Sequence, residues 1–141
     1  MKNRYLRLVV GSLAMAVSAA AHAVIVVDVP NIAGKSMKQV ADQLKTTPTC
    51  AKNKRGTKCD YNDGRVEIVY IGGKADWITV NGLEHVPFTD TAISRLGFSQ
   101  KAPSFRSSIV MRWDGLPGVV EASVFKGQRG SDYAYIKVKT R

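Results

Sequence analysis

Few residues of this chain could act together as a catalytic centre. Nucleophilic catalysis needs a Ser, Cys or Thr beside a base, and beyond the first 23 residues His85 is the one histidine in the sequence. The 11 acidic residues are scattered, so no carboxylate pair suited to acid–base work at one cleft stands out. The sequence therefore predicts a protein that is not an enzyme and uses no cofactor. A small hydrolase that depends on His85 is the alternative.

Cys50 and Cys59 are the two cysteines of the chain. An even count in an oxidising compartment favours a disulfide, and the short loop it closes predicts a contribution of about 2–3 kcal/mol to stability. The alternative, a zinc site, would require more ligands than two cysteines and the distant His85 provide. We therefore expect a disulfide and no metal.

A basic segment lies between the two cysteines and contains no acidic residue. A disulfide would hold its charges close together, and such a patch attracts an acidic protein surface, lipid head groups or phosphates. The alternative is a solvated loop whose charges only keep the domain soluble. The candidate anion-binding residues are Lys52, Lys54, Arg55 and Lys58.

Aromatic residues recur on one side of the expected strands. Strand alternation places Tyr133 and Tyr135 opposite the small and aliphatic Ala134 and Ile136, which suit a core covered by helices. The rings then fall on the uncovered side, where Trp and Tyr are typical of the energetic centres of interfaces. The alternative is a second, smaller core beneath a loop. The predicted partner-binding residues are Trp77, Trp113, Tyr133 and Tyr135.

The elements that would position these residues follow from periodicity and turn signals. Ser36 and Gln39 form a capping-box pattern, and apolar residues then recur at helical spacing up to Leu44. A second helix is expected between a cap at Thr89 and Gly97. Residues 49–64 are expected to form a loop. The expected strands cover 24–29, 65–71, 74–80 and the regions near 107–113, 118–125 and 131–139.

These elements predict an α+β fold with two layers. Strands joined by short turns must be antiparallel neighbours, and two short helices are expected on one face of a sheet of about five strands. Each half of the chain is expected to repeat a helix, a loop and a hairpin. With 141 residues, of which 45% are hydrophobic, the chain is long enough for one domain, expected at 24–141.

The first 23 residues have the features of a secretory signal peptide. Lys2, Arg4 and Arg7 precede an apolar stretch from Leu8 to Ala20, and Ala21-His22-Ala23 matches a signal peptidase site. Cleavage there would leave 118 residues with a net charge of +7 in place of +10. We therefore expect a soluble protein in the periplasm, or one that is fully secreted.

The segment from Gly34 to Val80 also resembles a known family. It reads GKSMKQVADQL, then a proline and a loop, then YNDGRVEIVYIGGKADWI. This pattern is similar to the helix–loop–hairpin unit of small exported domains that include the β-lactamase inhibitor protein and the small lipoproteins of the outer-membrane assembly machinery. The resemblance implies helices on one side of an antiparallel sheet and a protein partner on the other side or its edge loops.

Together these features predict an exported protein-binding module, such as an inhibitor, an immunity-type neutraliser or an accessory of envelope assembly. The expected partner is another envelope or secreted protein. The alternative is an envelope protein that binds lipopolysaccharide or anionic lipid through the basic segment. Single-stranded nucleic acid would suit basic and aromatic residues on a sheet, but export argues against that partner. The sequence leaves the oligomeric state open.

Overall fold

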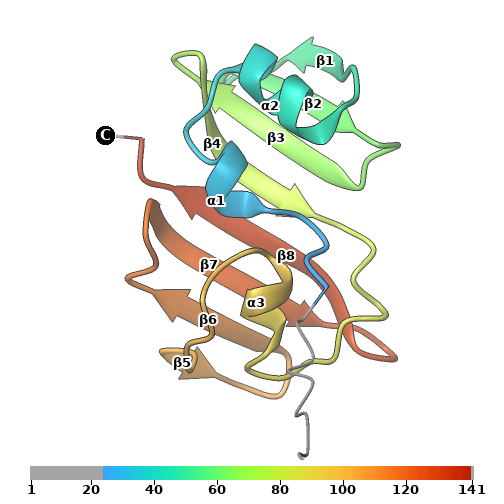
Figure 1. Cartoon of the computed structure of the whole chain (residues 1–141), viewed down its shortest axis with the longest axis vertical. Coiled ribbons are helices and arrows are strands. Elements are labelled where there is room, and N and C mark those ends of the chain that lie inside the picture. Colours follow the sequence, from blue (N-terminus) through green and yellow to red (C-terminus); the bar gives the residue numbers. More distant parts are fainter. Residues whose placement is uncertain (1–23, 141) are drawn as a thin grey trace, which may run out of the picture.

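The described part of the chain forms eight antiparallel strands and three short helices. The computed structural model describes residues 24–140, so the predicted signal peptide lies outside the described residues. The helices are α1 (Val29–Ile32), α2 (Met37–Leu44) and α3 (Ala92–Arg95), and all three lie on the same face of the sheet (Figure 1). The strands are β1 (Thr49–Lys52), β2 (Thr57–Tyr61), β3 (Val66–Ile71), β4 (Lys74–Val80), β5 (Phe105–Arg106), β6 (Val110–Asp114), β7 (Val119–Lys126) and β8 (Ser131–Val138).

The sheet consists of two four-stranded meanders that join edge to edge. The strand order is β1-β2-β3-β4-β8-β7-β6-β5, so β4 and β8, the last strand of each meander, pair with one another. In this pairing Trp77 lies opposite Lys137, and Thr79 lies opposite Tyr135. Each meander follows helical segments along the chain. The helix expected between Thr89 and Gly97 is shorter than predicted, because α3 covers only Ala92–Arg95, and its N-cap residue is Thr91, which makes no side-chain capping bond.

The core lies between the sheet and the three helices. Val29 and Ile32 from α1, Val40 from α2 and Ile93 from α3 are buried against it. The strand register aligns one residue from each central strand in a buried row that crosses both meanders. Because each of these side chains is 0% exposed, the two halves share one continuous core. The row contains Cys59, Ile68, Ile78, Ile136, Ala122 and Trp113.

Among residues 24–140, no helix is both long enough and apolar enough to cross a membrane.

The α+β class is confirmed, but the expected strand number is wrong. The sheet has eight strands, and residues 49–64, expected as a loop, contain β1 and β2. All four residues of β1 are exposed, so the strand has no buried face that would require alternating polar and apolar residues. Its sequence, Thr-Cys-Ala-Lys, shows no such alternation. The strand β5 has only two residues, Phe105 and Arg106, which is too short for any pattern.

The segment before α2 also differs from the sequence-based expectation. Residues 24–29 were expected to form a strand that stops at Pro30, but the chain is irregular to Asp28 and then forms α1. Pro30 lies in the first turn of this helix. Backbone N–H groups in that turn have no acceptor within the helix, so a proline, which lacks the N–H, is tolerated there. Backbone hydrogen bonds from Val26 to Arg95 and from Val29 to Leu96 tie the segment to α3. Its β-branched residues therefore pack beside a helix and outside the sheet.

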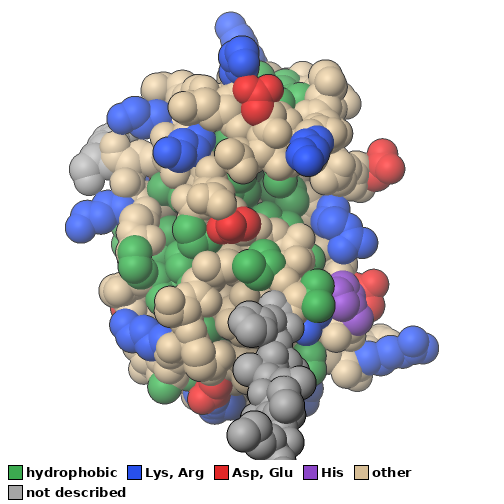
Figure 2. Space-filling model, viewed as in Figure 1, with side chains coloured by type: hydrophobic (Ala, Val, Ile, Leu, Met, Phe, Trp, Pro, Cys, Tyr) green, Lys and Arg blue, Asp and Glu red, His purple; other side chains and the backbone are tan. Residues whose placement is uncertain are grey.

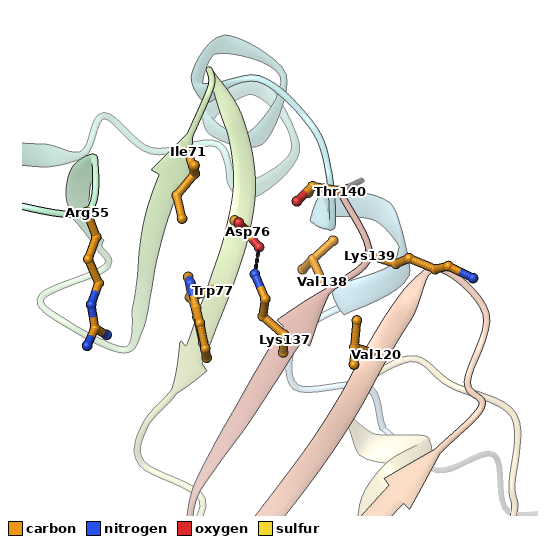
Figure 3. Close-up of a pocket in the computed structure, with 9 residues that line it drawn as sticks. All are labelled: Arg55, Ile71, Asp76, Trp77, Val120, Lys137, Val138, Lys139 and Thr140. Carbon is orange, nitrogen blue, oxygen red and sulfur yellow. Dashed lines mark hydrogen bonds and ion pairs between the residues drawn. The ribbon is translucent and has the colours of Figure 1, made fainter.

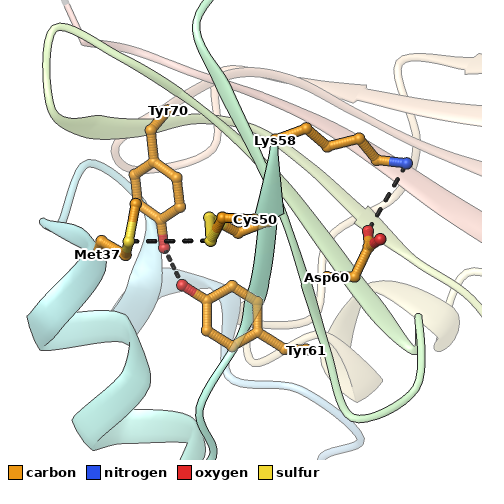
Figure 4. Close-up of a disulfide and its surroundings, with 7 residues drawn as sticks. Met37, Cys50, Lys58, Asp60, Tyr61 and Tyr70 are labelled. Carbon is orange, nitrogen blue, oxygen red and sulfur yellow. Dashed lines mark hydrogen bonds and ion pairs between the residues drawn. A yellow bond between two sulfur atoms is a disulfide. The ribbon is translucent and has the colours of Figure 1, made fainter. Parts of the chain in front are cut away.

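The capping box and the disulfide are confirmed. The Ser36 hydroxyl accepts from the Gln39 backbone N–H at 3.3 Å, and the Gln39 side chain accepts from the Ser36 N–H at 3.0 Å. Cys50 and Cys59 are joined as directly opposed residues of β1 and β2. The Met37 thioether from α2 lies beside this bridge (Figure 4). The disulfide therefore attaches the edge strand to the buried part of the sheet.

Candidate functional site

The face of the sheet opposite the helices is uncovered by any helix of the described residues (Figure 1). We call this surface the open face. Its central residues form two rows across both meanders, and most are partly exposed. One row is Asp60, Glu67, Thr79, Tyr135, Ser123 and Arg112, and the other is Lys58, Val69, Trp77, Lys137 and Glu121.

The other face has two tyrosines, Tyr61 and Tyr70, but their rings are buried beneath its surface. Figure 2 shows that its Lys and Arg side chains are separated from one another, mostly toward the margins, with hydrophobic side chains visible between the helices. Val24, Ile25 and Met37 are its large exposed hydrophobic residues near the N-terminal segment and α2. The open face is therefore the stronger candidate for a site.

Aromatic rings meet at the centre of the open face, where the two meanders join. The rings of Trp77 on β4 and Tyr135 on β8 have centroids 5.2 Å apart and are tilted by 40°. Tyr133 stacks on Phe125 of β7 at 4.5 Å. Of the four predicted partner-binding residues, the fold thus brings Trp77, Tyr133 and Tyr135 together. Phe125 was missed, although its alternation with the buried Val124 places it on the same face.

The prediction that Trp113 lies on the uncovered face is wrong. Trp113 lies on the opposite side of the sheet from this aromatic group. Its side chain is 0% exposed, and its indole N–H donates to the backbone oxygen of Lys101 at 2.7 Å. In the register Trp113 lies opposite Ala122, which belongs to the buried row. Alternation separates the two faces of a strand, but it does not tell which face a helix covers.

Ion pairs between neighbouring strands hold the charged side chains of the open face. The Lys58 ammonium lies 2.7 Å from the Glu67 carboxylate. Arg112 pairs with Glu121 at 3.3 Å in the same way. A third pair joins Lys137 to Asp76, whose side chain is only 4% exposed. Most charges of the open face are therefore neutralised within the protein.

The titration behaviour of these groups follows from the same contacts. The hydrogen bond between the two side chains raises the pKa of Lys58 and lowers the pKa of Glu67. Partial burial raises the pKa of Tyr135, which nearby Arg55 opposes. Tyr135 therefore stays neutral at ordinary pH and keeps its hydroxyl available as a hydrogen-bond donor.

The basic segment between the cysteines divides into different environments. Lys52 and Lys54 are exposed at the end of β1 and in the following turn. Lys58 is engaged with Glu67 on the open face. Arg55 lines the same pocket as Trp77 and runs alongside it in Figure 3. The four predicted anion-binding residues therefore do not form one patch of free charge.

The turn that carries Arg55 is held by local contacts. The Asn53 side-chain oxygen accepts from the backbone N–H of Arg55 and from that of Gly56, each at 2.9 Å. Gly56 packs so closely that a Cβ atom there would lie 2.0 Å from the Tyr70 carbonyl oxygen. Only glycine fits this contact, and the contact fixes the direction from which Arg55 approaches the open face.

Metal binding would require His, Cys, Asp and Glu side chains to cluster in the described part of the chain, and His85 is its one histidine. No group of three or more His, Cys, Asp and Glu residues within 24–140 could hold a metal ion. His85 is exposed in the connection between β4 and α3. The prediction that this protein is not an enzyme stays a prediction.

Comparisons of this chain with family models, with curated proteins and with solved structures find no match. The resemblance to the small exported domains therefore stays a prediction.

Proposed function

We propose that this protein is an exported protein-binding module that uses its open face to bind another envelope or secreted protein. Inhibition, neutralisation of a toxic protein and assistance to envelope assembly are roles that such a module fits. The observation that carries the proposal is the group of Trp77, Tyr135, Tyr133 and Phe125 at the centre of an uncovered sheet face.

The composition of this group supports a protein partner. Tryptophan and tyrosine supply most of the binding energy in many interfaces, especially near the centre. Trp77 and Tyr135 lie on the two strands that join the meanders, so they are central in the eight-stranded sheet. Charged residues surround them as ion pairs, which resembles the polar rim of an interface.

Contacts within the open face hold its central side chains before binding, which favours a smaller loss of entropy in a complex. Lys137 pairs with the buried Asp76 and also lies 4.4 Å from the ring centre of Trp77. Trp77 thus contacts both Lys137 and Tyr135 of β8 before any partner arrives. Side chains that are ordered in advance lose less conformational freedom in a complex.

The open face is also large enough for a specific interface. Eight strands at about 4.8 Å spacing span roughly 34 Å, and five residues at about 3.3 Å each span roughly 17 Å. Because β1 and β5 have fewer than five residues, the flat area of the sheet is at most roughly 580 Å². This area is of the same order as the roughly 800 Å² per partner of a standard complex.

The test is capture of a partner from envelope extract at low and high salt by the protein with its disulfide intact. We expect a stoichiometric protein that remains bound in high salt. Trp77→Ala and Tyr135→Ala should each weaken its binding about tenfold or more, whereas Gln43→Ala on α2 should not. If both aromatic variants remain folded and retain the same partner as fully as the parent protein, the proposal is wrong.

A second candidate function is favoured by the exposure of Lys52 and Lys54. These residues could contact lipopolysaccharide or anionic lipid. Binding of that kind falls as salt rises, because exposed charges are screened beyond about 8 Å at physiological ionic strength. We expect Lys52→Gln with Lys54→Gln to abolish such binding and Trp77→Ala to leave it unchanged. Sedimentation with anionic vesicles measures this, and binding that persists in high salt argues against it.

A further inference from the structure

A pocket of about 460 Å³ opens at one end of the open face (Figure 3). It lies where β3 and β8 end and where β4 and β7 begin. Ile71, Val120 and the ring of Trp77 provide apolar walls. Val120 is 53% exposed, which is a large apolar area to leave in water. A volume of this size is in the range of sites that receive a ligand or a side chain.

The charges around this pocket do not balance. Asp76 is its one acidic residue, and the carboxylate is 4% exposed and paired with Lys137. Arg55 and Lys139 also line the pocket. Arg55 is exposed, and its guanidinium forms no ion pair with any residue of the described range 24–140. The pocket therefore has positive charge left over beside an apolar wall.

The backbone of Arg55 is held by local contacts of its turn. The Asn53 side chain holds the turn through two N–H groups, and the contact of Gly56 with Tyr70 fixes how it lies on the sheet. Figure 3 shows Arg55 on one side of Trp77 and Lys137 on the other. A guanidinium presented in this way can form two parallel hydrogen bonds with a carboxylate.

We propose that this pocket receives an aspartate or glutamate side chain of the partner protein, with a neighbouring aliphatic residue against Val120 and Ile71. This inference rests on the proposed function. The carboxylate binds Arg55, and its methylene groups lie on Trp77. The central aromatic rings then supply most of the affinity, and the pocket selects partners with an acidic residue at the matching position.

The test uses nuclear magnetic resonance of the ¹⁵N-labelled protein and two blocked peptides, acetyl-Ala-Glu-Leu-Ala-amide and its Gln counterpart. The indole N–H signal of Trp77 reports on the pocket, while that of the buried Trp113 is an internal control. We expect the Glu peptide to shift the Trp77 signal saturably and the Gln peptide to bind at least about fivefold more weakly. Arg55→Gln should remove this difference, and the Trp113 signal should not move.

Three results would overturn the inference. The first is equal binding of the two peptides. The second is no shift of the Trp77 signal up to roughly 20 mM peptide, which exceeds the millimolar affinity expected for so short a ligand. The third is binding of free hexanoate as strong as that of the Glu peptide, which would assign the pocket to small amphiphilic anions.

The capture experiment separates this inference from the proposed function. Arg55 is exposed and holds no other side chain, so Arg55→Gln should leave the fold intact. If Trp77→Ala loses the captured partner while Arg55→Gln binds it as well as the parent protein does, the open face remains the binding site and the acidic anchor is wrong. We expect both variants to lose affinity.

Discussion

The two tryptophans should respond very differently to replacement by phenylalanine. Trp113 is 0% exposed and donates its indole N–H to the Lys101 carbonyl at 2.7 Å. Phenylalanine removes this donor and leaves a small cavity. Trp77 is partly exposed on the open face, where phenylalanine can still lie against Tyr135. The same substitution therefore tests which tryptophan belongs to the core.

The expected magnitudes follow from these surroundings. The hydrogen bond to the Lys101 carbonyl is part-buried, so its loss costs about 0.5–1.5 kcal/mol. The cavity left by the smaller ring in the core adds to this, so Trp113→Phe should lower the free energy of unfolding by at least about 1 kcal/mol. Trp77→Phe should change it by less than about 0.5 kcal/mol. Trp113→Ala should cost more than about 3 kcal/mol, which is a large share of the roughly 5–15 kcal/mol typical of a domain.

Urea denaturation followed by circular dichroism measures these differences. Both phenylalanine variants should fold, so the comparison does not depend on the survival of the alanine variant. A Trp113→Phe variant as stable as the parent protein, together with a strongly destabilised Trp77→Phe variant, would refute the assignment of faces. The open face would then have to be reassigned.

Three further predictions concern the disulfide, an ion pair and the turn beneath Arg55. Replacing Cys50 and Cys59 by alanine should lower the free energy of unfolding by about 2.6 kcal/mol, worked from their separation of 9 residues, and urea denaturation measures it. The hydrogen bond from the Lys58 ammonium group lowers the pKa of Glu67 in the folded protein. The ionised Glu67 side chain therefore stabilises the fold fully above its unfolded-state pKa of about 4.3, and this stabilisation is lost as the pH falls through the lower folded-state pKa. Glu67→Gln should therefore lose less than about 1 kcal/mol near neutral pH, since the pair is partly exposed, and unfolding measured across pH shows it. Gly56→Ala should destabilise the protein by about 1–3 kcal/mol and shift the amide signals of the turn, because the new Cβ would lie 2.0 Å from the Tyr70 carbonyl oxygen.

Each of these predictions has a matched control. The reduced parent protein should unfold like the double alanine variant, and equal stability with and without the bridge would contradict the first prediction. The Glu67→Gln variant and the parent should converge in acid, and a constant difference would contradict the second. For the third prediction the control is Gly72→Ala. A Cβ atom at this position would meet no other atom, and only the left-handed backbone conformation would be strained. Gly72→Ala should therefore lower the free energy of unfolding by less than Gly56→Ala.

The long strands and the capped helix could be predicted from the sequence because their signals are local. β4 matches its expected range of 74–80, and β8 differs from its own by one residue. Ser36 and Gln39 satisfy one another within a single turn, so their pattern predicts the start of α2 without knowledge of the rest of the fold. With two cysteines in the chain, the disulfide had one possible pairing.

The remaining features depend on contacts distant in the sequence. β1 is recognisable only through its pairing with β2, since all its residues are exposed. The face occupied by Trp113 is decided by Ala122 and the strands beyond it. The turn that places Arg55 at the same pocket as Trp77 packs through Gly56 against Tyr70, a residue of another strand. Propensity and periodicity contain none of this information.

Site-specific photo-crosslinking tests the role of the open face most directly. A photoreactive benzoylphenylalanine at Thr79 lies opposite Tyr135 in the register and leaves the aromatic rings unchanged. The same residue at the exposed Gln43 on α2 reports on the other face. In cells that produce the protein, we expect irradiation to give one discrete adduct with another protein from Thr79 and none from Gln43. An adduct from Gln43 with none from Thr79 would contradict the proposal that the open face binds the partner.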